Sequence, residues 1–304
     1  MNTASLQEEI LRRKKERGVA VLAHSYQAHE ICEIADVTGD SFRLAQAAQD
    51  LPQETILLCG VRFMAETAKL LNPAKRVLLS HPDAGCPMAD QWDGPMLREA
   101  KAAFPGYAVV AYVNTTAETK AESDVCVTSS SAVAIVRKLP ERDILFIPDC
   151  NLGAYVASQV PEKNVKTLHG GCPTHARMTL ADVRRAREGH PGAEFLVHPE
   201  CPPAVVACAD FVGSTAAILK RARESTARDF IIGTENSIAE HLAYECPGKN
   251  FHVLSKQLIC PNMKLTTLPD VLRAIEGKGG EEIAIPPEIE EPARRSLERM
   301  LELG

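Results

Sequence analysis

Three cysteines, each followed by proline, divide the chain into segments of nearly equal length. Cys86, Cys172 and Cys260 are separated by 86 and 88 residues, and an apolar run lies shortly before each of them. Such regular spacing indicates an internal repeat, and a repeat restricts the fold more than a single motif does. The chain is therefore expected to contain one structural unit three times.

The repeat continues residue by residue from three strand-like runs, which begin at Ala20, Ala108 and Glu194. Four positions after each start, the run ends in a polar or aromatic residue: His24, Tyr112 and His198. Six positions after each start stand Tyr26, Asn114 and Glu200. An aspartate recurs at an offset of 16 and a hydroxyl residue at an offset of 21: Asp36, Asp124 and Asp210, then Ser41, Ser129 and Thr215. Agreement at this many offsets indicates triplication of one α/β unit.

Strands that alternate with helices are typical of parallel sheets with helices on both faces. The sequence therefore predicts an α/β fold of three homologous three-layer αβα units, with small parallel sheets around a pseudo-threefold axis. The predicted units span residues 1–90, 91–176 and 177–264, and each contains one of the three cysteines. Residues 265–304 are predicted to form C-terminal helices that pack on the first unit, because residues 267–277 repeat the pattern of residues 179–189.

The composition is that of a globular protein, with 45% hydrophobic and 24% charged residues. The net charge of −6 without a basic block argues against a nucleic-acid partner but allows small anionic substrates. No apolar stretch is long enough for a membrane span, and residues 1–18 lack the apolar core of a secretory signal. We therefore expect a cytoplasmic protein, in which ten cysteines are core thiols or metal ligands rather than disulfides.

The recurring residues follow predicted strands, and ligands of parallel sheets bind beyond the carboxyl ends of the strands. The residues at offsets of 4, 6 and 21 and the three cysteines therefore share one edge of each unit. If the three units meet with these edges facing inward, all of these side chains converge on one cavity.

Three thiolates suit an iron–sulfur cluster that leaves one iron free of protein, because an electron-transfer cluster usually takes four cysteines. Zinc held by three cysteines and a water is a competing interpretation. A third interpretation is that the cysteines are core thiols retained by the repeat. The convergence of the other recurring residues favours a metal, and an iron–sulfur cluster over zinc.

The other recurring residues predict an anion site with acid–base groups. Ser41, Ser129 and Thr215 each precede a predicted helix, where they serve as N-caps and where amide N–H groups attract carboxylate or phosphate. Glu200 is the only carboxylate at the offsets of 4 and 6, so it is the first candidate for the general acid or base. The aspartates at the offset of 16 are expected to have a structural role in turns.

No P-loop, dinucleotide-binding glycine motif or HExxH motif occurs in the chain. Ten short stretches, in order along nearly the whole chain, resemble quinolinate synthase, the iron–sulfur enzyme of de novo NAD biosynthesis. They are residues 23–27 (AHSYQ), 38–41 (TGDS), 60–69 (GVRFMAETAK), 112–117 (YVNTTA), 127–130 (VTSS), 148–153 (PDCNLG), 171–175 (GCPTH), 198–201 (HPEC), 213–215 (GST) and 260–264 (CPNMK). Ser131 stands where the family has asparagine, and Met263 stands where long members carry a second cysteine, so the chain resembles the short members.

The resemblance implies condensation of iminoaspartate with dihydroxyacetone phosphate to quinolinate, with loss of phosphate and water. It also implies a [4Fe-4S] cluster whose open iron acts as a Lewis acid, and a supply of iminoaspartate from L-aspartate oxidase or aspartate dehydrogenase. The family's residue roles carry over to matching positions as follows: Cys86, Cys172 and Cys260 as cluster ligands; Glu200 and Tyr26 moving protons beside His24 and His198; His24, His198, Tyr112 and Asn114 holding the intermediate; Ser41, Ser129 and Thr215 binding carboxylates or phosphate.

Two other classes of protein share part of this pattern. Diphthamide synthases of the radical-forming type also have three units and a three-cysteine cluster, but they need a site for adenosylmethionine and a protein partner, and the chain suggests neither. An iron–sulfur or zinc sensor would need an output module, and the three units and their tail account for all 304 residues.

Overall fold

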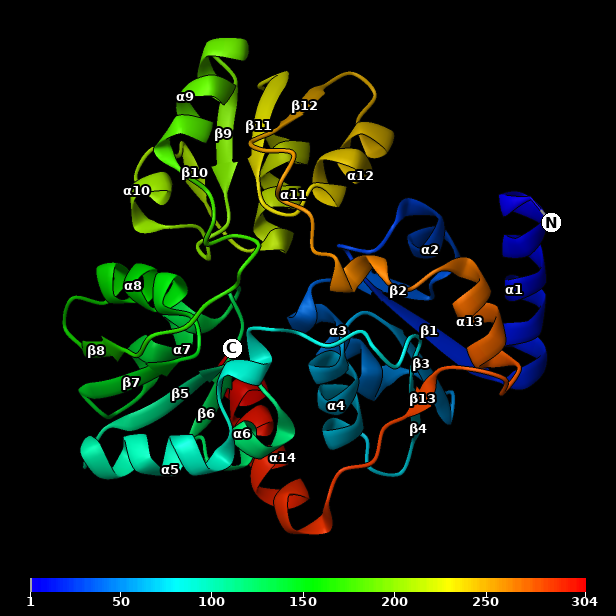
Figure 1. The fold of residues 1–304 in the computed structure, drawn as a ribbon, viewed down its shortest axis with the longest axis horizontal. Coiled ribbons are helices and arrows are strands. Elements are labelled where there is room, and N and C mark those ends of the chain that lie inside the picture. Colours follow the sequence, from blue (N-terminus) through cyan, green and yellow to red (C-terminus); the bar gives the residue numbers. More distant parts are fainter. Residues whose placement is uncertain (1) are drawn as a thin grey trace.

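The computed structural model describes residues 2–304, which form three lobes around a common centre (Figure 1). Each lobe is an α/β unit with the same order of helices and strands, which confirms the predicted fold class. The unit boundaries at residues 90, 176 and 264 stay predictions. None of the helices described between residues 2 and 304 combines the length and the apolar composition that a membrane span requires.

Each unit alternates four helices with four strands. The first contains α1 (Thr3–Arg17), β1 (Val19–His24), α2 (His29–Ile34), β2 (Val37–Gly39), α3 (Ser41–Asp50), β3 (Thr55–Cys59), α4 (Arg62–Leu71) and β4 (Arg76–Leu79). The second contains α5 (Gly94–Ala103), β5 (Ala108–Tyr112), α6 (Ala117–Ala121), β6 (Val125–Val127), α7 (Ala132–Lys138), β7 (Asp143–Ile147), α8 (Cys150–Gln159) and β8 (Asn164–Thr167). The third contains α9 (Leu180–Gly189), β9 (Glu194–Val197), α10 (Pro203–Val206), β10 (Phe211–Val212), α11 (Thr215–Glu224), β11 (Asp229–Gly233), α12 (Ser237–Glu245) and β12 (Asn250–Val253).

The three sheets share one topology. In each unit the order across the sheet is second strand, first, third and fourth, and all neighbouring pairs among these four strands are parallel. The central strands β1 and β5 are buried along their whole length, as expected for strands with helices on both faces. Two short 3-10 helices, η1 (Ala89–Gln91) and η2 (Asn262–Lys264), lie in the loops that follow β4 and β12.

The recurring aspartates accept hydrogen bonds from backbone amides near the start of each first strand, which confirms their structural role. The carboxylate of Asp36 accepts a hydrogen bond from the Val21 amide at 2.7 Å. The carboxylate of Asp124 accepts the equivalent bond from Val109 at 2.7 Å. In the third unit, Asp210 accepts one from Phe195 at 2.8 Å. The sequence repeat is therefore also a repeat of hydrogen bonds.

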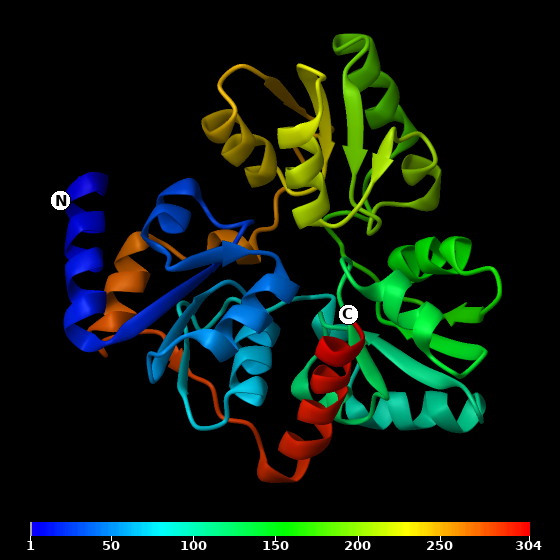
Figure 2. The same cartoon turned by 180° about the vertical axis from the view of Figure 1, so that it is seen from behind.

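The C-terminal segment contacts two of the units. Helix α13 (Leu268–Ile275) packs on α1 and β3, and β13 (Glu281–Glu282) pairs antiparallel with β4 as a fifth strand of the first sheet. Helix α14 (Pro287–Leu303) packs chiefly on α6 and β6 of the second unit, and also contacts α4 of the first. Both ribbon views place it between these two lobes (Figures 1 and 2).

The hydrophobic core is continuous through the first two units and includes Met263 at the end of the third. One cluster of buried side chains extends from Leu22 in the first unit to Val160 in the second, and it includes Leu297 and Met300 of α14. The third unit has two cores of its own, one on each face of its sheet. Polar contacts therefore carry much of the attachment of the third unit.

We expect Asp124→Ala to lower the free energy of unfolding by about 1–3 kcal/mol, because the buried Val109 amide loses its acceptor. Asp124 isolates this bond, since Asp36 and Asp210 also pair with Lys14 and Arg187. Urea unfolding of the metal-free protein measures the change. Asp124→Asn, which keeps an acceptor oxygen, should recover most of it, and the exposed control Glu8→Ala should change little. A loss no larger for Asp124→Ala than for the control would contradict the structural role.

Candidate active site and metal centre

A cavity of about 900 Å³, including its mouth, lies where the three units meet. It is lined by all twelve residues that the sequence predicts for the site: His24, Tyr26, Ser41, Cys86, Tyr112, Asn114, Ser129, Cys172, His198, Glu200, Thr215 and Cys260. The roles of these residues stay predictions, but the geometry brings them together without exception.

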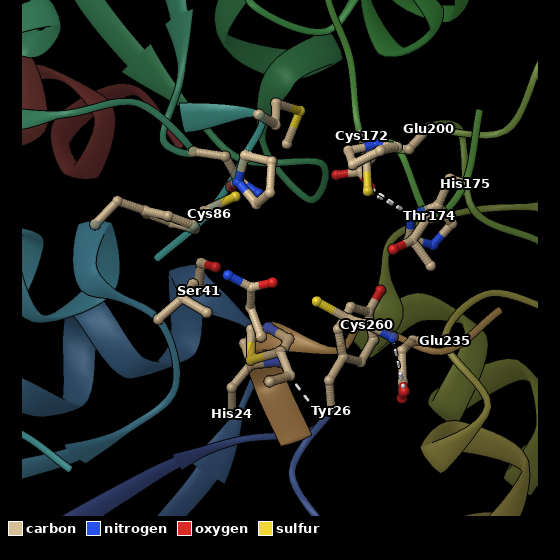
Figure 3. A pocket seen from close by; sticks show the side chains of 18 of the residues that line it. His24, Tyr26, Ser41, Cys86, Cys172, Thr174, His175, Glu200, Glu235 and Cys260 are labelled. Atoms are coloured by element: carbon tan, nitrogen blue, oxygen red, sulfur yellow. Dashed lines mark hydrogen bonds and ion pairs between the residues drawn. The ribbon is translucent and has the colours of Figure 1, made fainter. Parts of the chain in front are cut away.

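The convergence follows from the direction of the strands. His24 is the last residue of β1, Tyr112 is the last residue of β5, and His198 directly follows β9. Each ends the first strand of its unit, so the carboxyl edges of the three sheets face the common centre. Tyr26 and Glu200, two residues further along, enter the same cavity from the loops (Figure 3).

The expected helix cap at Ser41 is wrong by one residue. Asp40 is the N-cap of α3, and its carboxylate accepts a hydrogen bond from the Arg43 amide at 3.0 Å. Aspartate caps a helix as well as serine does, so the preceding position took the role. The other oxygen of Asp40 accepts a hydrogen bond from the Ser130 hydroxyl at 2.8 Å. The N-terminus of α3 therefore carries its own negative charge, which weakens its attraction for an anionic ligand.

The other two hydroxyl residues also differ from caps. Thr215 is the first residue of α11, and Ser214 caps that helix by accepting a hydrogen bond from the Ala217 amide at 3.2 Å. Ser129 lies in the turn before α7, and Ser131 occupies the capping position there without capping the helix through its side chain. Because its cap is neutral, the N-terminus of α11 is a better anion site than that of α3, which is capped by Asp40.

Glu200 is buried at the centre of the polar wall. Its Oε1 atom accepts a hydrogen bond of 2.6 Å from the hydroxyl of Tyr112. Its Oε2 atom lies 2.8 Å from Nδ1 of His175 and 3.9 Å from Nδ1 of His198. One carboxylate from the third unit thus contacts two residues of the second.

Burial and charge determine the protonation states around this carboxylate. Burial alone would raise the pKa of Glu200, but His175 and His198, with the hydrogen bonds from His175 and Tyr112, reverse this effect and lower the pKa. Burial lowers the pKa of His24 and of His198 to about 4. Near neutral pH, Glu200 is therefore a carboxylate and both of these imidazoles are neutral.

Two tyrosines supply hydroxyl groups to the cavity. Burial is the largest of the effects that raise the pKa of Tyr26 and of Tyr112 well above the usual value. Both phenols are therefore protonated near neutral pH and can donate hydrogen bonds. The hydroxyl of Tyr26 lies 3.0 Å from Oγ1 of Thr215 and 2.8 Å from Oγ1 of Thr234.

Sequence reasoning missed His175 and Thr234, which join these groups into one hydrogen-bonded chain. Nε2 of His175 lies 3.1 Å from Oγ1 of Thr234, and Nδ1 faces Glu200. The chain runs from Tyr112 through Glu200, His175 and Thr234 to Tyr26. His175 could have been predicted from the sequence, because it stands three residues after Cys172 in one of the family stretches.

The three recurring cysteines enter the cavity from three different loops, with their side chains directed toward its interior (Figure 3). All three are free thiols. Burial raises the pKa of Cys86 to about 12, raises that of Cys172 well above its usual value, and raises that of Cys260. Three thiols that line one cavity form a donor set that fits an iron–sulfur cluster, and a positively charged metal group would stabilise their thiolate forms.

A second donor set shares one of these cysteines. One ligand atom each from Cys172, His175 and Glu200 lie within 4.8 Å of one another, which would suit a single metal ion. The cavity also contains Asn114, whose Oδ1 atom is buried without a hydrogen-bond partner among the described residues. A buried acceptor of this kind fits a ligand that donates an N–H or O–H group.

Comparison with known proteins gives one consistent result. The family model described as "Quinolinate synthetase A protein" matches residues 8–302. A quinolinate synthase of Alkaliphilus metalliredigens is 49% identical over 303 residues, covering 100% of both chains. One of Methanoregula boonei is 50% identical over 302 residues, covering 99% of both, and one of Caldicellulosiruptor bescii is 46% identical over 304 residues, covering 100% of both. With this agreement over its full length, the chain belongs to the quinolinate synthase family of enzymes.

Proposed function

We propose that the enzyme condenses iminoaspartate with dihydroxyacetone phosphate to form quinolinate, with loss of phosphate and water. The observation that carries the proposal is the convergence of three cysteines and nine recurring polar residues on one cavity. We further propose that the reaction takes place in the cytoplasm and that L-aspartate oxidase or aspartate dehydrogenase supplies the iminoaspartate. Nucleic acids and membranes have no part in it.

Cys86, Cys172 and Cys260 would hold a [4Fe-4S] cluster. When bound with one iron free of protein, such a cluster supplies a Lewis acid at the wall of the cavity. The geometry supports this assignment, because the three thiols line one cavity from three different loops. The unpaired acceptor of Asn114 supports a nitrogen or hydroxyl ligand beside them.

The anionic substrates would bind mainly at the N-terminus of α11. Thr215, the first residue of that helix, lines the cavity, and the cap Ser214 is uncharged. Ser129 adds a hydroxyl group, held 3.2 Å from Nε2 of His198. Ser41 contributes less to the electrostatic attraction than the repeat suggested, because Asp40 lies at the start of its helix. The neutral rings of His24 and His198 can donate or accept hydrogen bonds to the bound molecules.

Glu200 would act as the general base. It is ionised and buried, and the hydrogen bond from Tyr112 holds it in place. Ring formation requires a proton to leave carbon and protons to reach departing hydroxyl groups. The protonated hydroxyl of Tyr26 is a suitable donor, and the chain through Thr234 and His175 links it to the carboxylate that receives the proton. Through this chain a proton taken up by Glu200 can return to Tyr26, so that both groups regain their starting protonation states.

A single zinc ion at Cys172, His175 and Glu200 is the alternative metal centre. It would use the same cavity but would occupy Glu200 as a ligand, so that residue could not serve as a base. It would also leave Cys86 and Cys260 without a function. The recurrence of all three cysteines in the sequence favours the cluster.

We expect protein purified without oxygen to be brown, with about four iron atoms per chain, and to form quinolinate from the two substrates. Elemental analysis and the absorption spectrum measure the cofactor, and chromatography measures the product. Replacing Cys86, Cys172 or Cys260 by serine should reduce cluster content and activity together, whereas Cys246→Ser should change neither. A colourless protein with one zinc per chain would contradict the cluster and favour the alternative centre.

We expect Glu200→Gln to retain the iron content but to lower kcat by at least about a hundredfold, because the amide cannot accept a proton. Steady-state kinetics on samples matched for iron measure the effect. Glu240→Gln, at an exposed position on α12, serves as the matched control. Full turnover by Glu200→Gln would exclude this residue as the base. Loss of iron together with activity would instead indicate that Glu200 is a ligand of the metal.

A further inference from the structure

Hydrogen bonds between the units join the three cysteine-bearing loops to one another. We define loop 1 as residues 80–91, loop 2 as residues 168–177 and loop 3 as residues 254–264; each follows the fourth strand of its unit. In loops 1 and 3, the cysteine is followed by a short 3-10 helix, η1 or η2. Both of these turns present a side-chain amide to a different cysteine-bearing loop.

Gln91, the last residue of η1, ties loop 1 to loop 2 with two hydrogen bonds. Its Oε1 atom accepts from the Gly171 amide at 2.8 Å, and its Nε2 atom donates to the Gly171 carbonyl at 3.1 Å. Gly171 directly precedes the ligand Cys172. The adjacent Gly170 has a φ of 154°, and a Cβ atom there would lie 2.4 Å from the Pro148 carbonyl oxygen and 2.8 Å from Oε1 of Gln91. Glycine is therefore needed for this close approach.

Asn262, the first residue of η2, ties loop 3 to loop 1 in a comparable way. Its Nδ2 atom donates to the Gly85 carbonyl at 2.9 Å, and Gly85 directly precedes the ligand Cys86. In both cases the bonded backbone group belongs to the residue before the cysteine of another loop. Cys172 and Cys86 are thus each one residue away from a hydrogen bond that fixes the backbone to a neighbouring loop.

A third tie completes a ring of contacts around the cavity. His175 in loop 2 reaches Thr234 of the third unit, and the next residue, Glu235, lies 3.5 Å from the amide nitrogen of Cys260. Loop 1 therefore contacts loop 2, loop 2 contacts the residues beside Cys260 of loop 3, and loop 3 contacts loop 1. The three loops use a glutamine, a histidine and an asparagine for this purpose, so the ties do not recur in the sequence.

We propose that Gln91 and Asn262 are positioning residues that hold the three cysteine loops in a cluster-binding arrangement. The inference rests on the proposed cluster on Cys86, Cys172 and Cys260. Ligands fixed in place by the fold lose less conformational freedom when they bind a metal group, so the group dissociates more slowly. Neither Gln91 nor Asn262 contacts Glu200, Tyr26 or the histidines of the cavity through the hydrogen bonds described above.

The test measures loss of the cluster rather than activity. Wild type, Gln91→Ala, Asn262→Ala and the control Gln257→Ala are reconstituted without oxygen and challenged with an iron chelator, and the decay of the iron–sulfur absorption is followed. Gln257 is an exposed glutamine in loop 3. We expect loss to be about fivefold faster for each hydrogen bond removed, which gives fivefold for Asn262→Ala and more for Gln91→Ala. The control should match the wild type.

Further measurements separate the possible outcomes. Gln91→Glu keeps the acceptor for Gly171 but loses the donor, so its rate should lie between those of the wild type and Gln91→Ala; it also decides the matter if Gln91→Ala fails to fold. Cobalt(II) binding to the metal-free variants, read from thiolate-to-cobalt absorption, should weaken in the same order. Wild-type rates in all variants would overturn the inference. A wild-type protein that takes up no cluster would overturn the proposed cofactor instead.

Discussion

Parallel pairing brings the carboxyl ends of all strands in a sheet to one edge, and the predicted site residues of this chain lie at or near such edges. A sheet of four short strands has only a small edge. Three sheets that face inward form a closed wall without a large domain. The polar groups of the site are therefore supplied by strand ends and loops, while the apolar strands remain in the cores.

This arrangement has an energetic consequence at the junction of the units. The first two units share a core, but the third is attached largely through polar contacts. These include the bonds of Tyr26 to Thr215 and Thr234, and the side-chain ammonium of Lys264, which donates to the Tyr26 carbonyl at 2.6 Å. Buried polar contacts depend strongly on geometry, so they fix the orientation of the third unit more sharply than apolar packing would.

The repeat in the sequence was sufficient to predict the fold class and to bring twelve residues to one cavity, because the copies share the positions at their strand ends. It could not reveal groups that differ between copies. His175 corresponds to Ala89 and Met263, three residues after the other two cysteines, and Thr234 corresponds to Gly60 and Pro148. Chemistry that needs one histidine or one threonine leaves no periodic signal, and the ties made by Gln91 and Asn262 are hidden for the same reason.

Some periodic signals were present and were not used. Lys75, Lys163 and Lys249 stand at one offset in the three units. Each donates hydrogen bonds to backbone carbonyls at or just after the end of the third helix of its unit, α3, α7 or α11. The cap at Asp40, by contrast, carries no periodic signal: the offset of 21 identifies a shared hydroxyl, while the neighbouring carboxylate caps a helix equally well.

The position of helix α14 has a practical consequence for handling the protein. A Cβ atom added to Gly304 would lie 3.3 Å from side-chain atoms of both Phe42 and Ser131, so the chain ends against the first turns of α3 and α7. Both turns adjoin the cavity. Helix α1, in contrast, lies on the outside of the first lobe (Figure 1). A probe attached to an exposed residue of α1 would therefore disturb the cavity less than one attached to the last turn of α14.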